Sequence, residues 1–241
     1  MNNSCHGQEA CRKAAFQGTS AGNVGVLNDS CIGERACYCI GGYGGSVGNM
    51  NNSCKGQNAC RDAASWYGNL GDINDSCKGQ DACRFAATMN GNLGNINDSC
   101  NGQYACRDAA WSYGNLGVIT QSCNADSACK NLAHERGSAG NINHSCNGQY
   151  ACSAAVEMYG IIGDVTYSCN GDSACEYLAT MGQVGNVTHS CNTTMACTLA
   201  AFGDPYYKGG LGAISASCNA YKACVGAGAN GSSFTSYYSY A

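Results

Sequence analysis

Twenty of the 21 cysteines in this sequence fall into ten pairs with the same spacing, Cys-x5-Cys. Two kinds of chemistry are open to such pairs: oxidation to a disulfide, or binding of a metal ion. Zinc sites usually separate their cysteines by two to four residues and often recruit histidine. Here the spacer is always five, and the four histidines stand at unrelated places, at His6, His134, His144 and His189. We therefore predict a disulfide in each pair, with no metal ion and no other cofactor.

The predicted disulfides imply an oxidising compartment, so we expect the protein to be extracellular, either secreted or at the cell surface. Cys39 falls outside the pattern, and we expect a buried thiol there, with a link to another chain as the alternative. The predicted pairs are Cys5 with Cys11, Cys31 with Cys37, Cys54 with Cys60, Cys77 with Cys83, Cys100 with Cys106, Cys123 with Cys129, Cys146 with Cys152, Cys169 with Cys175, Cys191 with Cys197, and Cys218 with Cys224.

The pairs recur with a fixed period. The six steps from Cys31 to Cys169 are all 23 residues, and the remaining steps are 26, 22 and 27 residues. A constant period of this size is typical of a solenoid, in which each coil contacts only its neighbours. We predict one solenoid of about ten coils over residues 1–224, followed by a tail or cap rich in glycine, serine and tyrosine over residues 225–241.

Each repeat offers little large apolar surface. Numbered from the first cysteine, the consensus is Cys-x-Gly-x-x-Ala-Cys-x-x-Ala-Ala-x-x-x-Gly-Asn-Leu-Gly-x-Ile-x-x-Ser. Only the Leu and Ile positions recur as large aliphatics, as in Leu70 and Ile73, so one coil alone cannot bury enough surface to fold. Closing a seven-residue loop with a disulfide contributes about 2.4 kcal/mol in the chain-entropy model, which makes up part of the difference.

Two architectures fit the period. A parallel β-helix places Gly, Asn and Ser at its corners, and we favour it because Asn-Gly or Lys-Gly often follows the first cysteine. The alternative is a leucine-rich-like α/β solenoid, because Ala and Cys at positions 6, 7, 10 and 11 have the spacing of a helix face and alanine disfavours strands.

The sequence resembles one known repeat. Residues 96–105 read Ile-Asn-Asp-Ser-Cys-Asn-Gly-Gln-Tyr-Ala, which is similar to the Ile-x-x-Ser-x-Phe-x-x-Asn-x-Ala repeat of polymorphic outer-membrane adhesins and related right-handed β-helix passenger domains. The likeness covers nearly every repeat, although here each repeat is one residue shorter, with Cys near the Phe position and a second Cys after Ala. The resemblance implies an extracellular binding or scaffolding β-helix and transfers no active site.

Composition and charge exclude several classes of protein. The net charge of -4 gives no indication of nucleic-acid binding. No apolar run approaches the roughly 20 residues of a membrane helix, and no basic start precedes an apolar stretch, so we expect neither a membrane span nor a signal peptide in this sequence. Acids and histidines are scattered or periodic rather than clustered, so we expect no catalytic residues and no enzyme activity.

Two rows of side chains are candidates for binding. Position 8 carries Arg61, Arg84 and Arg107 in successive repeats, with Trp66 and Trp111 a few residues on, a combination that suits glycans. The simpler interpretation, which we favour, is a solvated face whose charge Asp62 and Asp108 neutralise.

The second row is polar. Position 21 carries Asn28, Asn51, Asn74, Asn97 and Asn143, and we expect these side chains to point inward as a ladder that satisfies backbone groups at the corners. If they point outward, they form a flat polar array. Each also begins an Asn-x-Ser sequon, so a secreted eukaryotic product could carry glycans there.

Residues 1–5 read Met-Asn-Asn-Ser-Cys and recur unchanged at residues 50–54, so the sequence starts in mid-repeat without a capping segment. Solenoids normally need capped ends, so we expect end-to-end contact with another copy or membership of a longer protein. We thus predict a non-catalytic structural or interaction solenoid, such as a surface-layer, adhesin or filament subunit. Ice binding and glycan binding along the arginine row are the alternatives.

Overall fold

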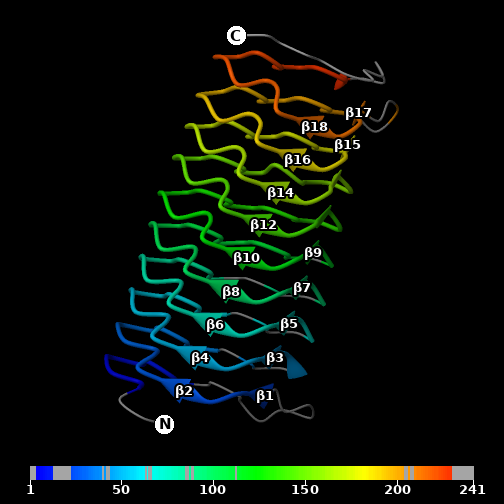
Figure 1. Cartoon of the computed structure of the whole chain (residues 1–241). Coiled ribbons are helices and arrows are strands. Elements are labelled where there is room, and N and C mark those ends of the chain that lie inside the picture. Colours follow the sequence, from blue (N-terminus) through cyan, green and yellow to red (C-terminus); the bar gives the residue numbers. More distant parts are fainter. Residues whose placement is uncertain are drawn as a thin grey trace.

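The computed structural model describes residues 4–12, 23–39, 41, 44–62, 64, 67–84, 87, 90–111, 113–203, 206 and 209–229. Over these ranges the chain winds as a regular stack of turns, with the first described residues at one end of the stack and the last at the other (Figure 1). The described residues contain no α-helix, and every strand is two residues long.

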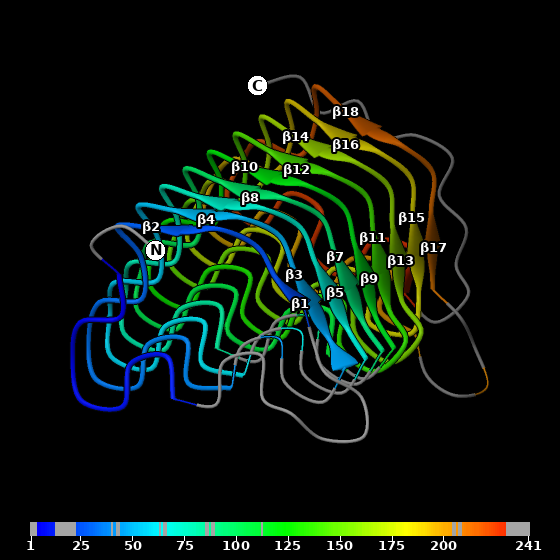
Figure 2. The ribbon, with the colours of Figure 1, turned by 90° about the horizontal axis from the view of Figure 1, so that it is seen from below.

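The strands form two parallel sheets that run the length of the stack, each with nine strands (Figure 2). The first sheet contains β1 (Asn23–Val24), β3 (Ser46–Val47), β5 (Asn69–Leu70), β7 (Asn92–Leu93), β9 (Asn115–Leu116), β11 (Ser138–Ala139), β13 (Ile161–Ile162), β15 (Gln183–Val184) and β17 (Gly210–Leu211). The second contains β2 (Leu27–Asn28), β4 (Met50–Asn51), β6 (Ile73–Asn74), β8 (Ile96–Asn97), β10 (Ile119–Thr120), β12 (Ile142–Asn143), β14 (Val165–Thr166), β16 (Val187–Thr188) and β18 (Ile214–Ser215).

The prediction of a parallel β-solenoid with one disulfide per 23-residue repeat is confirmed. The predicted number of about ten coils is slightly too high, because nine strands in each sheet define eight steps from turn to turn. The tenth cysteine pair closes its loop, but no strand follows it among the described residues. The described start of the predicted tail lies against the last turn, where Gly210 N donates to Gly228 O at 3.0 Å.

The register follows directly from the period. Because 23 residues make one turn, each residue pairs with its equivalent, as Leu70 does with Leu93 and Ile73 with Ile96. Within each short strand one side chain points inward and the next outward. Ile73 is completely buried whereas Asn74 is half-buried. The apolar core is therefore a column of stacked aliphatics, alanines and cystines.

The alternative with a helix is wrong, and the backbone shows why. In the segment that carries the cysteines, left-handed residues recur every few positions, including Cys77 at φ 55°, Asp81 at φ 53°, Cys83 at φ 52° and Ala87 at φ 58°. A right-handed helix cannot continue through such residues. The backbone instead bonds to the next turn, as where Cys83 N donates to Ala105 O at 3.0 Å.

Glycine at position 15 sets how closely successive turns approach. A Cβ on Gly91 would lie 1.6 Å from the carbonyl oxygen of Ala110 in the next turn. Equivalent carbonyl oxygens lie at 1.3 Å for Gly68 and 1.6 Å for Gly114. Because backbone atoms cannot move aside without breaking the register, these positions require glycine.

We expect Gly91→Ala to lower the free energy of unfolding by about 3 kcal/mol, since overpacking against backbone forces the turns apart. Denaturant unfolding of the oxidised protein measures the change. Gly212→Ala is the matched control, because a Cβ there meets nothing within 4 Å, and its effect should stay within about 0.5 kcal/mol. Equal stabilities of the two variants would contradict the close approach of the turns.

Candidate functional site

The ten disulfides lie along the inside of the cysteine-bearing side of the stack. Sulfur atoms of adjacent turns approach one another, and those of Cys106, Cys123 and Cys129 all lie within 4.8 Å. Because these sulfurs are bonded in pairs, they are not available as thiolate ligands for a metal ion. Cys39 lies outside the column and is half-buried rather than buried, and its thiol hydrogen-bonds the carboxylate of Asp62.

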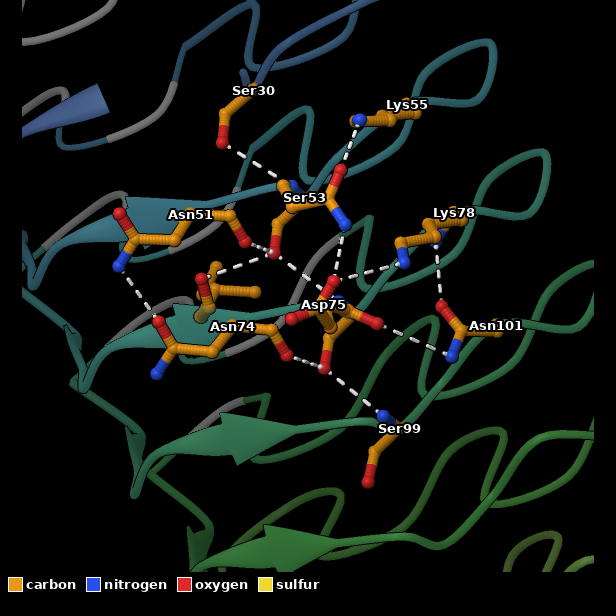
Figure 3. A network of polar contacts seen from close by, with 12 residues as sticks. Ser30, Asn51, Ser53, Lys55, Asn74, Asp75, Lys78, Ser99 and Asn101 are labelled. Atoms are coloured by element: carbon orange, nitrogen blue, oxygen red, sulfur yellow. Dashed lines mark hydrogen bonds and ion pairs between the residues drawn. The ribbon is translucent and has the colours of Figure 1, made fainter. Parts of the chain in front are cut away.

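A buried serine ladder runs beside the sulfur column. Ser53 Oγ donates to Asn51 O at 2.7 Å (Figure 3), and Ser76 N donates to Ser53 Oγ at 3.2 Å. The pattern repeats in the next turn, where Ser99 N donates to Ser76 Oγ at 3.0 Å. The serine hydroxyls thus bond backbone groups that are shielded from water. The sequence shows a Ser before every cysteine pair, but it did not indicate that these hydroxyls are buried.

The asparagine row at position 21 points outward, so our expectation of an inward ladder is wrong. Strand alternation buries the neighbouring Ile and leaves the Asn side chain half-buried on the outer face. The amides bond one another instead of the backbone: Asn28 Nδ2 donates to Asn51 Oδ1 at 2.9 Å, and Asn51 Nδ2 to Asn74 Oδ1 at 2.8 Å. Glycosylation at Asn28, Asn51, Asn74, Asn97 and Asn143 remains a prediction.

A different row satisfies the corner backbone. At position 19, Asn49 N donates to Asp72 Oδ1 at 2.6 Å, and Asp72 N donates to Asn95 Oδ1 at 2.9 Å. The amide donors of this corner therefore bond side chains of the next turn. Sequence reasoning missed the role of these residues, although Asn or Asp at position 19 recurs in several repeats.

The arginine row at position 8 lies against acidic groups. Arg61 Nε is 3.8 Å from Asp62 Oδ2, and Arg84 NH1 is 3.0 Å from Asp81 Oδ1. The Arg107 guanidinium lies 5.3 Å from the ring centre of Tyr104. The stripe is therefore largely compensated rather than a bare cationic surface, and Asp81 is a partner that sequence reasoning did not name.

Trp111 is the tryptophan of this pair that the described residues include. Its ring packs at a tilt of 39° on His134, with ring centres 4.7 Å apart. His134 Nδ1 lies 3.6 Å from Glu157 Oε1 in the following turn. Trp66 lies outside the described residues.

Burial dominates the electrostatics of the acids beside the arginines. Desolvation raises the pKa of Asp62 and of Asp108 above the usual value of 3.8, and the neighbouring arginines offset only part of this effect. Both carboxylates therefore cost folding free energy when they are ionised.

Two aromatic stacks on the surface were not expected. The Arg136 guanidinium lies between the rings of Tyr113 and Tyr159, at 5.5 and 5.7 Å from their centres. On the other side of the stack, the ring of Tyr167 lies between His144 and His189, at 4.7 and 5.2 Å. Each stack places equivalent positions of three successive repeats in a column, which follows from the register.

Comparison of the chain with protein-family models, with curated proteins and with solved structures found no match. In the described ranges, no helix has the length and apolar character that crossing a membrane requires. The arrangement of the described residues therefore carries the functional argument alone.

We expect Asp108→Asn to stabilise the protein relative to wild type at neutral pH but not in acid. Because burial raises the pKa of Asp108 in the folded state, the cost of its ionisation develops as the pH rises from 3.8 through the raised pKa. Denaturant unfolding at about pH 3 and about pH 7 measures this difference. Asp98→Asn, on an exposed corner, controls for net charge, and an identical pH dependence of the two variants would contradict the assignment to burial.

Proposed function

We propose that this protein is an extracellular structural element, a stiff rod rather than a catalyst. The observation that carries the proposal is the combination of two continuous nine-stranded sheets with one disulfide in every repeat. Disulfides of this density are typical of secreted proteins, which must hold their shape without the help of a large core. The described surface is built from repeated rows, without a set of polar groups that converges on one point.

The finer proposal is that the rod serves in a surface layer, an adhesin or an end-to-end filament. In a parallel solenoid each terminal strand leaves one edge available for a further strand. At the end that follows β18, Gly210 N in β17 donates to Gly228 O, so the backbone after the last cysteine pair occupies this edge of the first sheet. End-on contact between copies would therefore use the edge of the second sheet. The repeated Met1 segment that motivated this expectation includes residues outside the described ranges.

Electron microscopy of the native material, with antibody labelling of the oxidised protein, tests this function. We expect label on extracellular structures and rods whose width matches a single solenoid, and filaments if the ends associate. Sedimentation of the purified protein over a range of concentrations tests the end contacts separately. Labelling confined to the cell interior would overturn the structural role outside the cell.

Ice binding is a second candidate, supported by the outward direction of the position-21 row. In that row Asn97 is followed by Thr120, and Asn143 by Thr166, on one face of the second sheet. Regular uncharged groups on a stiff face are what an ordered water lattice would require. Thermal hysteresis of the oxidised protein tests this candidate, and the absence of both hysteresis and crystal shaping would eliminate it.

A further inference from the structure

The outer face of the first sheet and the turn that leads into it carry two neighbouring exposed rows that none of the functions above uses. We call this surface the Tyr–Asn face, and it is formed by positions 14 and 16 of repeats 3 to 7. Position 14 carries Tyr67, Asn90, Tyr113, Arg136 and Tyr159, and position 16 carries Asn69, Asn92, Asn115, Ser138 and Ile161.

The five residues at position 14 share one backbone conformation. Their φ angles lie between 65° and 72°, in the left-handed region that usually favours glycine. Three of the five are tyrosines, at every second turn, and they are among the most exposed large side chains described, at 59% for Tyr67, 54% for Tyr113 and 61% for Tyr159. Left-handed residues recur throughout this fold, so the exposure of the three rings, and not their backbone conformation, marks this row.

The second row supplies regularly spaced amides. Asn69 Nδ2 donates to Asn92 Oδ1 at 2.9 Å, and Asn92 Nδ2 donates to Asn115 Oδ1 at 2.9 Å. Asn69 and Asn92 each use one donor hydrogen in this ladder, so the second hydrogen of each amide remains for a ligand. The face therefore offers an amide in each of repeats 3 to 5, followed by Ser138 and Ile161, beside one aromatic ring for every two turns.

Charge decides what kind of polymer fits this face. Arg136 is the only cationic residue in the two rows. Its guanidinium lies between the rings of Tyr113 and Tyr159, and its NH1 donates to Tyr159 OH at 3.4 Å. The exposed Glu135 adjoins it, so the local charge is balanced, and the chain as a whole carries -4. Balanced local charge gives a polyanion no attraction while the net charge of -4 repels it, and a polycation finds no acidic row in positions 14 and 16. The face is therefore complementary to an uncharged partner.

We propose that the Tyr–Asn face binds a neutral linear polysaccharide that lies along the axis of the stack. Sugar rings pack on aromatic side chains through their C–H faces, and sugar hydroxyls exchange hydrogen bonds with amides and with the guanidinium of Arg136. Turns repeat every ~4.8 Å, so the four steps from Tyr67 to Tyr159 span roughly 19 Å, close to one sugar per turn in an extended chain. This site differs from the arginine row at position 8, whose charge is compensated.

The direct test is affinity electrophoresis of the oxidised full chain in gels that contain hydroxyethyl cellulose as a neutral β-glucan, or polygalacturonate as a polyanion. We expect retardation by the neutral glucan and none by the polyanion. Isothermal titration with cello-oligosaccharides should show affinity that rises from two sugars to about four and then levels off, as the span of the tyrosines predicts.

The variant Tyr113→Ala/Tyr159→Ala should lose at least tenfold in affinity for the glucan, and Arg136→Ala should lose about threefold. Tyr150→Ala is the matched control, because Tyr150 is 44% exposed but lies at position 5, away from this face, and its affinity should be unchanged. Circular dichroism and the disulfide map confirm that each variant is folded. If the double variant does not fold, Arg136→Ala and the length series carry the test.

Three results would overturn the proposal: no retardation of the wild type by any neutral glucan, equal binding by the double variant and the Tyr150→Ala control, or preference for the polyanion. A wild type that dimerises while the double variant stays monomeric would show that a second copy of the chain occupies this face instead. None of these results bears on the proposed structural role, which depends on the disulfides and the sheets.

Discussion

Equivalent residues lie on one another throughout this solenoid, and the rest of the structure depends on that register. The 23-residue period puts Ile73 on Ile96 and Leu70 on Leu93, and it brings glycine at position 15 against the backbone of the next turn. Because strands contain only two residues, neither sheet is stable by itself. The hydrogen bonds between turns and the cystine inside each turn therefore replace the large apolar core that the sequence does not provide.

In this repetitive structure, the position of a polar side chain in the repeat decides which groups it hydrogen-bonds. Serine before each cysteine pair bonds buried backbone groups, as Ser53 does. Asn or Asp at the corner accepts from the backbone of the preceding turn, as Asp72 does. On the outer faces asparagine amides bond one another in columns, as Asn69 does with Asn92. A single substitution within a row thus affects at least two turns. At an exposed corner, by contrast, a residue that departs from the consensus, such as Arg136, adds a new functional group without disturbing the stack.

The period, the disulfides and the parallel stacking could be predicted from the sequence because they depend on spacing alone. The directions of the side chains could not. Asn51 and Ser53 are two residues apart and both polar, yet the amide points outward and the hydroxyl is buried, because left-handed Asn52 lies between them and breaks the alternation of a simple strand. For the same reason the helix-like spacing of Ala and Cys was misleading. The Tyr–Asn face also escaped sequence reasoning, since its residues vary from repeat to repeat and only the register shows that they share a face.

The claim that the cystines and the register together hold the fold is tested most directly by complete reduction. A phosphine reductant is added under otherwise native conditions, and far-ultraviolet circular dichroism is recorded together with amide hydrogen exchange. With so small an apolar core, loss of the ten cross-links should abolish the sheet signal and the protection of amides such as Ile96 N, which donates to Asp72 O at 2.8 Å in the oxidised protein. A fully reduced chain that keeps its sheet signal and its protected amides would contradict this account.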